Sequence, residues 1–416
     1  MRILVLCHRL PYPPNKGDKI RSFHEIRHLA ERHQIHLLSF ADPDQSGTTE
    51  EGLREYCAAV EVFPLNRRAA QLRCLAGALG TKPLTLSYFR SLALARRVEE
   101  LAGTAKFDTV MACGSAMAQY AERAAGIPRL LDMVDVDSVK WEQYSQHASW
   151  PKSFIWRLEA RRLSRYESSL AESFDRIVLT TSNDAEKFSS IAHGAESSVV
   201  RNGIDLDIAR EVRFPKAAAP TLVFTGQMDY FANVDGVVHF ATKVFPILRA
   251  NFPDLRFLIV GRSPTREVVS LSRLPGVRVT GEVDDVRPYL TESWVFIAPL
   301  RIAQGVQNKV LEAMAMGIPA VVSQRVMAGL ADGGFRDGRD VLVAVDEQQT
   351  VIALERLLRD EKMRASLASS ARSRLAASYS WAVNMNTLEQ QLEELVQSAA
   401  AAYPYSESES AELQPV

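Results

Sequence analysis

The sequence predicts an α/β protein made of two Rossmann-like domains that face each other across a cleft. Short apolar strands alternate with helical segments twice along the chain, first from residue 2 and again from residue 221. This alternation is typical of parallel sheets covered by helices. The segment 213–220 (RFPKAAAP) separates the two sets and has the composition of a linker. A chain of 416 residues is long enough for two or three domains of roughly 100–200 residues each.

The first domain is predicted to span residues 1–212 and to bind the acceptor of any transferred group. Its strands are apolar throughout, as expected where helices cover both faces of a parallel sheet. The predicted strands are 2–7, 35–40, 60–64, 109–112, 129–133 and 177–181. A loop from Pro11 to Gly17 follows the first strand and leads into a helix over 20–32. A basic amphipathic helix is predicted over 154–174, and Asn202-Gly203 marks a turn.

The second domain is predicted over residues 213–378, and beyond Glu347 the chain is expected to be helical. Its predicted strands are 221–225, 256–260, 277–280, 295–298 and 320–323, with a helix over 235–250. A terminal helix over 379–397 carries a narrow apolar seam with spacings of four and three, which predicts docking on a neighbour. The seam consists of Trp381, Met385, Leu388, Leu392 and Leu395. The Ser/Glu-rich end, 398–416, is expected to be disordered.

Composition excludes several classes of function. The formal net charge of -1 gives no bulk attraction to nucleic acid. Four cysteines, without C-x-x-C pairing or zinc spacing, indicate reduced and mostly buried thiols in a cytoplasmic protein. The amino terminus lacks the pattern of a signal peptide, and no stretch approaches the about 18 apolar residues of a membrane helix.

The most informative segment is 304–319, QGVQNKVLEAMAMGIP, between two apolar strands. Its pattern predicts a helix opened by Gly305 and closed by Gly-Ile-Pro. At helical spacing Gly305, Asn308, Lys309 and Glu312 lie on one stripe. A glycine there lets an anion approach the free N–H groups, the lysine neutralises the anion, and the carboxylate accepts hydrogen bonds from sugar hydroxyls. This layout suits a nucleotide sugar.

Four segments carry a resemblance to a known family. They are PYPPNKGDKIRS, LLDMVDVDSVKWEQY, TGQMDYFANVDGV and QNKVLEAMAMGIPAVVS. With them the chain resembles the GT-B glycosyltransferases of retaining family 4, and more closely the sugar transferases associated with bacterial exopolysaccharide clusters. The resemblance implies a nucleoside diphosphate (NDP) sugar donor held mainly by the second domain and an acceptor held by the first. It also implies metal-independent retention at the anomeric carbon, no cofactor, and a carboxy-terminal helix that crosses back to the first domain.

The chain departs from this family at one informative position. The family usually has two glutamates eight positions apart, and here the second is Glu312 while the first is replaced by Gln304. The first glutamate commonly contacts the transferred sugar. A glutamine still forms hydrogen bonds to hydroxyls but adds no charge near a developing oxocarbenium. The second half also starts Gly226-Gln227, without the arginine and lysine that many relatives use on the diphosphate, so basic residues elsewhere are the substitutes. The predicted donor-binding residues are Gly17, Gly226, Arg262, Arg301, Gly305, Asn308, Lys309 and Glu312.

The predicted catalytic residues are Asp135, Asp137 and Gln304. Asp135 and Asp137 follow a strand, and the expected role is hydrogen bonding to an acceptor hydroxyl, with one of them as a general base. Capping of the following helix is the structural alternative. Asp-Val-Asp also resembles a manganese motif, but that motif belongs to a fold with one nucleotide domain, so no metal site is predicted. Gly17 lies where parallel sheets bind ligands, and its alternative is a plain β–α loop.

Two segments are candidates for peripheral contact with the inner membrane. A basic amphipathic helix can lie on anionic lipid, and 154–165 and 72–97 both combine arginines with large apolar residues. An ordinary surface helix is the alternative. The predicted activity is transfer of a sugar to a saccharide or lipid-linked acceptor in exopolysaccharide biosynthesis. The rival functions are an NDP-sugar 2-epimerase of the same fold and a non-catalytic scaffold of a polysaccharide assembly complex.

Overall fold

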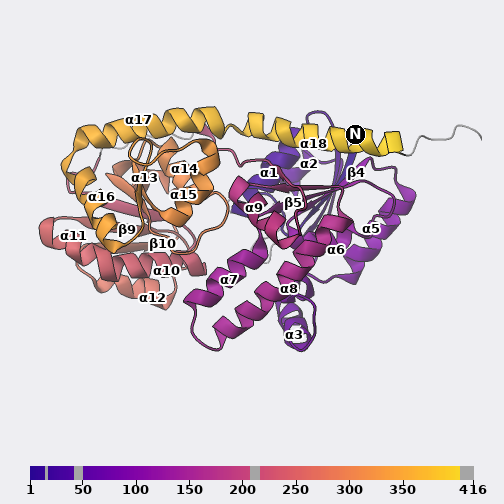
Figure 1. Ribbon diagram of the computed structural model, residues 1–416, viewed down its shortest axis with the longest axis horizontal. Helices are drawn as coiled ribbons and strands as arrows, with labels where there is room; N and C mark the ends of the chain where they lie inside the picture. Colours follow the sequence, from indigo (N-terminus) through magenta and orange to yellow (C-terminus); the bar gives the residue numbers. More distant parts are fainter. Residues whose placement is uncertain (15–16, 42–49, 207–215, 403–416) are drawn as a thin grey trace, which may run out of the picture.

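The computed structural model describes residues 1–14, 17–41, 50–206 and 216–402. These residues form two α/β domains, each built on a parallel sheet with helices on both faces, as the sequence predicted (Figure 1). The predicted domain boundary at 212/213 and the first part of the predicted linker lie outside the described residues.

The first domain contains a sheet with strand order β3-β2-β1-β4-β5-β6-β7. Its strands are β1 (Arg2–Cys7), β2 (Gln34–Phe40), β3 (Ala59–Phe63), β4 (Thr109–Cys113), β5 (Arg129–Val134), β6 (Arg176–Leu179) and β7 (Ser198–Val199). Its helices are α1 (Gly17–Leu29), α2 (Glu51–Arg54), α3 (Arg67–Gly77), α4 (Leu84–Tyr88), α5 (Leu92–Thr104), α6 (Ser115–Ala121), α7 (Asp137–His147), α8 (Lys152–Ser173) and α9 (Ser182–Ile191). The strand order reverses between β1 and β4, whose carboxyl ends therefore border a natural ligand crevice.

The second domain repeats this architecture with strand order β10-β9-β8-β11-β12-β13. Its strands are β8 (Thr221–Thr225), β9 (Arg256–Val260), β10 (Val277–Gly281), β11 (Val295–Ala298), β12 (Ala320–Ser323) and β13 (Leu342–Ala344). Its helices are α10 (Phe231–His239), η2 (Phe240–Val244), α11 (Phe245–Asn251), α12 (Arg266–Ser270), η3 (Leu271–Arg273), α13 (Arg287–Glu292), α14 (Asn308–Ala315), α15 (Gln324–Leu330), η4 (Ala331–Gly333), α16 (Glu347–Arg359) and α17 (Glu361–Ser378). The reversal here lies between β8 and β11.

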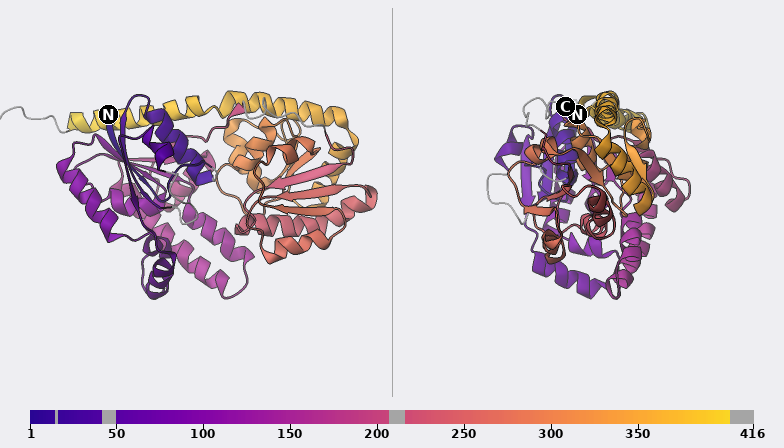
Figure 2. Two further views of the ribbon diagram at one scale, coloured as in Figure 1. Left: turned by 180° about the vertical axis from the view of Figure 1, so that it is seen from behind. Right: turned by 90° about the vertical axis from the view of Figure 1, so that its left-hand side faces the viewer.

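The last helix crosses back to the first domain, as predicted. Figure 2 shows α17 along the second domain and α18 (Trp381–Ala402) continuing along the first. The apolar seam of α18 is buried in the first domain's core, where Leu388 and Leu392 are fully inaccessible. On the same interface the buried carboxylate of Glu389 accepts hydrogen bonds from His33, at 2.9 Å, and Arg32, at 3.3 Å. These contacts fix α18 to the end of α1.

Several helix boundaries differ from the predictions: the helices predicted over 20–32, 154–174 and 235–250 are Gly17–Leu29, Lys152–Ser173 and the α10–η2–α11 segment Phe231–Asn251. The terminal helix continues to Ala402 rather than ending at residue 397, because the alanines at 399–402 are strong helix formers. Residues 403–416 of the predicted disordered tail lie outside the described residues. The helix predicted to open at Gly305 begins at Asn308 instead, with Gln307 as its N-cap. Gly305 has a φ of +58°, which an α-helix does not accommodate.

Candidate active site

A cleft of 1480 Å³ separates the two domains and is lined by residues of both. It lies at the carboxyl ends of the strands where each sheet reverses its order. From the first domain His8 follows β1 and Ser115 follows β4, and from the second Gly226 follows β8 and Ile302 follows β11. Two facing reversal points therefore contribute to one crevice, which is the position expected of a ligand site in this architecture.

Helix α14 supplies the wall of the cleft on the second domain. Asn308, Lys309 and Glu312 all line the cleft, as the predicted stripe required. The rest of this helix is buried, so the stripe carries its polar side chains into the crevice. The amino-terminal turn of a helix exposes unpaired N–H groups with about half a positive charge, which favours a bound anion.

Lys309 and Glu312 occupy a partly desolvated site. The Lys309 ammonium donates a hydrogen bond to Asn233 Oδ1 and lies 4.9 Å from the centroid of the Phe224 ring. Burial lowers the pKa of Lys309 to about 8, and the neighbouring Glu312 opposes this shift. Burial also raises the pKa of Glu312 to about 7, which Lys309 opposes. A ligand that brings opposite charge or hydrogen-bond partners would therefore stabilise the charged form of each group.

Two glycines in the cleft region are required by close approach. A Cβ at Gly226 would lie 3.3 Å from Lys309 Nζ and 2.8 Å from Asn233 Nδ2, so a side chain would crowd the cation. A Cβ at Gly305 would lie 2.1 Å from Asp135 Oδ1. Gly305 therefore lets the first domain's aspartate approach the second domain, rather than opening α14 to an anion.

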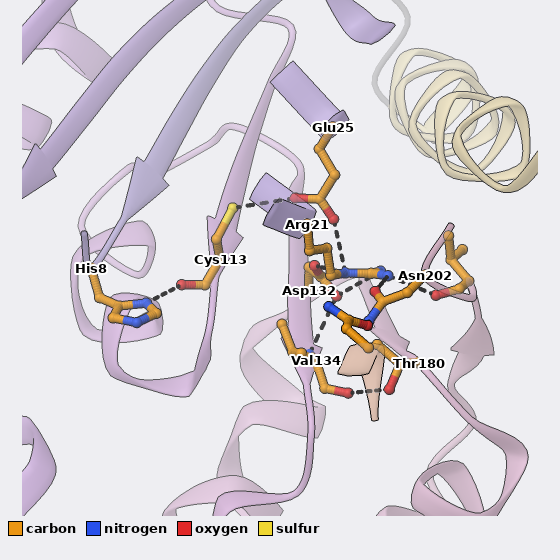
Figure 3. A network of polar contacts seen from close by, with 10 residues as sticks. His8, Arg21, Glu25, Cys113, Asp132, Val134, Thr180 and Asn202 are labelled. Atoms are coloured by element: carbon orange, nitrogen blue, oxygen red, sulfur yellow. Dashed lines mark hydrogen bonds and ion pairs between the residues drawn. The ribbon is translucent and has the colours of Figure 1, made fainter. Parts of the chain in front are cut away.

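A buried ion pair shapes the first domain's wall (Figure 3). The Arg21 guanidinium donates to both oxygens of Asp132, at 2.6 and 3.1 Å, and neither side chain is accessible to solvent. Asp132 in turn accepts from the backbone N–H of Val134, at 3.3 Å. Val134 has a φ of +65°, a strained conformation for a β-branched residue. The strained turn places the next residue, Asp135, in the cleft.

Asp135 and Asp137 line the cleft but differ in charge. Burial and the neighbouring Asp184 raise the pKa of Asp135 to about 7. The pKa of Asp137 is lowered because Lys140 and Ser115 outweigh the effect of its burial. Ser115 Oγ donates to Asp137 at 2.7 Å, and Lys140 forms an ion pair with the same carboxylate. Asp137 is thus already neutralised, whereas Asp135 has a pKa suited to exchanging a proton near neutral pH.

Gln304, predicted as catalytic, bridges the two domains. Its Oε1 accepts a hydrogen bond from Lys187 Nζ of α9, at 2.9 Å. Its Nε2 is buried and has no hydrogen-bond partner. The side chain lines the cleft and is only 8% exposed. An unpaired buried N–H group costs about 1–3 kcal/mol, so this amide is a strong candidate for a ligand contact.

The second domain can also be identified by comparison. Residues 219–360 match a family model described as glycosyl transferases group 1. The second domain is therefore similar to the transferases of that family over these residues. The chain is also 29% identical over 255 residues to the phosphatidyl-myo-inositol mannosyltransferase of Propionibacterium freudenreichii, a match that covers 57% of this chain and 60% of that protein. The chain thus spans less than two thirds of this relative. Together the two matches support a transferase enzyme.

Solved structures establish the fold. Sucrose-phosphate synthase from Thermosynechococcus elongatus matches with a TM-score of 0.69 at 15% identity, over 96% of this chain and all of the other. HepE from Anabaena, in complex with UDP and glucose, matches with a TM-score of 0.65 at 13% identity, over 95% of this chain and all of the other. These matches confirm the predicted GT-B arrangement of two domains and a cleft.

The remaining predicted donor residues differ in their position relative to the cleft. Arg262 lines the cleft and lies 3.5 Å from Gln227 Oε1. Gly17, from the first domain, also lines it and lies beside Asn308. The structure does not bring Arg301 to the cleft, because its guanidinium is paired with Asp235 on α10. Gly305 is likewise absent from the lining residues.

The sequence analysis missed several residues that join the second domain to the first. Asn202, read only as part of a turn, accepts from Arg21 at 2.9 Å and donates to Asn308 Oδ1 at 3.2 Å. An aromatic cluster joins α7 and α8 of the first domain to α10 of the second. The ring centroid of Phe231, on α10, lies 4.9 Å from that of Trp156, on α8. It lies 5.3 Å from the ring centroid of Tyr144, on α7. No periodic pattern in the sequence predicts such contacts, because they join residues of the first domain to residues of the second.

Proposed function

We propose that the protein is a glycosyltransferase that moves a sugar from an NDP-sugar donor to a saccharide or lipid-linked acceptor. The observation that carries this proposal is the position of α14. Its amino-terminal turn, with Lys309 and Glu312, opens into a cleft that faces Asp135 of the first domain. A bound diphosphate needs positive charge, a ribose needs a hydrogen-bond acceptor, and sugar transfer needs a base for the acceptor hydroxyl. The cleft brings groups of all three kinds together.

The donor's diphosphate fits the wall formed by α14. The helix N-terminus, Lys309 and Arg262 would stabilise the charge that develops on the leaving diphosphate. Glu312 would accept hydrogen bonds from the ribose hydroxyls, because no described residue donates a hydrogen bond to its carboxylate. HepE is a structural neighbour bound to UDP and glucose, and the same class of donor is proposed for this protein.

The acceptor fits the wall formed by the first domain. With a pKa of about 7, Asp135 would take the proton from an acceptor hydroxyl near neutral pH. Asp137 would hold the loop through its pair with Lys140. We propose retention at the anomeric carbon, which the resemblance to retaining family 4 implies. Trapping the product and determining its anomeric configuration by NMR tests this point.

Metal independence is part of the proposal and rests on how the first domain's aspartates are occupied. Asp132 is enclosed by Arg21, and Asp137 is paired with Lys140. Two of the three carboxylates in this segment are therefore already paired with cations from the chain itself. Activity that persists in EDTA would support this arrangement. Loss of activity that Mn²⁺ restores would contradict it.

A lipid-linked acceptor is supported by the relative's name, phosphatidyl-myo-inositol mannosyltransferase, and by an exposed apolar surface beside the cleft. That surface comprises Leu72, Leu75 and Leu79 of α3 and its following loop, and Trp150, Phe154 and Ile155 around the start of α8. Leu79 is 99% exposed, yet its loop is held by the buried Arg162, which donates to the carbonyl of Ala78 at 2.7 Å. Residues 67–98 contain no Asp or Glu.

We therefore propose peripheral contact of this surface with the inner membrane, on the cytoplasmic side and in exopolysaccharide assembly. Basic and apolar side chains together suit an anionic bilayer. Among the described residues, no helix is both long and apolar enough to cross a bilayer. Co-sedimentation with phosphatidylglycerol vesicles that Leu79→Glu abolishes would support the contact. Equal sedimentation of both proteins would contradict it.

The central experiment screens UDP-, GDP-, ADP- and dTDP-sugars by thermal shift, since a ligand that binds only the native state raises its apparent stability. The binding sugar nucleotide is then assayed for transfer with wild type, Glu312→Ala and Lys309→Ala. Loss of transfer in both variants with an unchanged fold supports the proposal, and unchanged turnover in both refutes it. Conversion of the donor alone into an isomeric sugar nucleotide would indicate the rival epimerase. Binding without turnover on any acceptor would indicate the scaffold.

A further inference from the structure

Two carboxamides on the second domain's side of the cleft are oriented by cations of the first domain. A lysine ammonium has only hydrogen-bond donors, so the side-chain oxygen of Gln304 must face Lys187, and its NH₂ group must face away. Lys187 is itself held by the buried Asp184, whose carboxylate lies 3.5 Å from Nζ and is fixed by Thr181. Gln304 lines the cleft, and its Nε2 is buried without a hydrogen-bond partner.

Asn308 is oriented in a similar way by a cation of the first domain, but through one intervening residue, Asn202. The Arg21 guanidinium, also a pure donor, fixes the side-chain oxygen of Asn202 toward itself. The Asn202 NH₂ group then donates to Asn308 Oδ1, so the Asn308 NH₂ group points elsewhere. Asn308 lines the cleft beside Gly17. Two independent chains of contacts thus give the same result, an NH₂ group presented by the second domain and set by the first.

We propose that Lys187 is a positioning residue that makes Gln304 a hydrogen-bond donor toward the transferred sugar when the two domains are together. This inference rests on the proposed function and adds a specificity to it. The recognised sugar places a hydrogen-bond acceptor, such as a carboxylate, acetamido carbonyl or hydroxyl oxygen, against Gln304 Nε2. A glutamate at this position would keep the Lys187 contact with one oxygen and present the other as an acceptor.

The decisive variant is Gln304→Glu, because it preserves the contact with Lys187, reverses the hydrogen-bond polarity toward the cleft and adds one negative charge there. The panel contains UDP-glucose, UDP-N-acetylglucosamine, UDP-glucuronic acid and GDP-mannose, with UDP and GDP as sugar-free probes. For the sugar nucleotide that wild type prefers, kcat/KM is expected to fall at least tenfold in the variant. The Kd of the matching sugar-free nucleotide is expected to stay within twofold. Equal or higher kcat/KM would overturn the inference.

The second variant pair tests Lys187 itself. Lys187→Met frees the amide to rotate, so the preference among the four sugars should weaken, whereas Lys187→Arg retains a pure donor and should restore that preference. Lys243→Met, at an exposed position on η2, is the control. In the double variant Lys187→Met/Gln304→Glu the losses should not add, because both act through one contact. Preferences identical to wild type in Lys187→Met would overturn the inference. If wild type binds no sugar nucleotide at all, the proposed function fails and this inference fails with it. If wild type binds and transfers a sugar but neither variant changes the preference, only this inference fails.

Discussion

Replacing Lys309 with methionine tests whether this partly buried cation serves the ligand rather than the fold. Methionine has a similar length but removes the charge, and with it the cation–π contact with Phe224. Burial already lowers the pKa of Lys309 to about 8, so the folded protein holds this cation at a cost. Asn233 Oδ1 loses its partner in the variant, a penalty of about 1–3 kcal/mol that the relief of desolvation offsets. The free energy of unfolding is expected to change by less than about 1 kcal/mol.

The effect on function should be much larger. Two opposite unit charges 4 Å apart interact by about 4 kcal/mol at an effective dielectric constant of 20. Part of this interaction already exists when the donor binds, and the rest appears as charge develops on the leaving diphosphate. A loss of about 2–4 kcal/mol in transition-state stabilisation corresponds to a fall in kcat/KM of roughly 30- to 1000-fold. The assay combines steady-state transfer kinetics with denaturant unfolding of the same protein.

The refuting result is clear because stability and activity are expected to separate. If Lys309→Met keeps kcat/KM within threefold of wild type, the diphosphate does not lie at the start of α14. If both activity and stability collapse, Lys309 is a structural residue. Lys243→Met, which removes an exposed lysine of the same domain, should change neither quantity.

Three further predictions follow from other contacts. Arg21→Met leaves Asp132 buried without its cation and should cost about 3–5 kcal/mol of unfolding free energy in urea, so a loss below about 1 kcal/mol would contradict the assigned ion pair. Leu388→Ala empties a fully buried position of the α18 seam and should cost about 2–5 kcal/mol, whereas the exposed Val383→Ala should cost little. Affinity for a sugar nucleotide, whose diphosphate diester keeps its charge over this range, should peak between pH 7 and 8. It should fall above about pH 8 as Lys309 loses its proton, and below about pH 7 as Glu312 gains one. Glu312→Gln should remove the acidic limb, and a limb that persists unchanged would assign it to another group.

The local patterns of the sequence predicted most of the fold. Strands β8 and β9 have the predicted bounds, because short apolar runs between turn residues fix both their length and their burial. The α18 seam was predicted from a spacing of four and three and is buried as expected. Strand β13 was not predicted, since Leu342–Ala344 is too short to show a period.

Gly305 illustrates the limit of such reasoning. A glycine before an amphipathic run is typical of a helix start, and the sequence contains nothing to separate that role from another. The structure shows that the position is required by Asp135, some 170 residues earlier in the chain, whose carboxylate would lie 2.1 Å from a Cβ. The requirement comes from the contact between domains, which leaves no local pattern.

Gln304 extends this argument from backbone to chemistry. The sequence shows that a carboxamide replaces the glutamate usual at this position, but a carboxamide can present either an oxygen or an NH₂ group. Which group faces the cleft depends on Lys187, on another domain and more than 100 residues away. The same dependence links Asn308 to Arg21 through Asn202. Separated domains would leave both amides free to rotate, so the hydrogen-bond polarity of the donor site is a property of the assembled cleft. If the proposed function holds, the specificity for the donor sugar is expected to depend on the relative position of the domains as much as on the residues that touch the ligand.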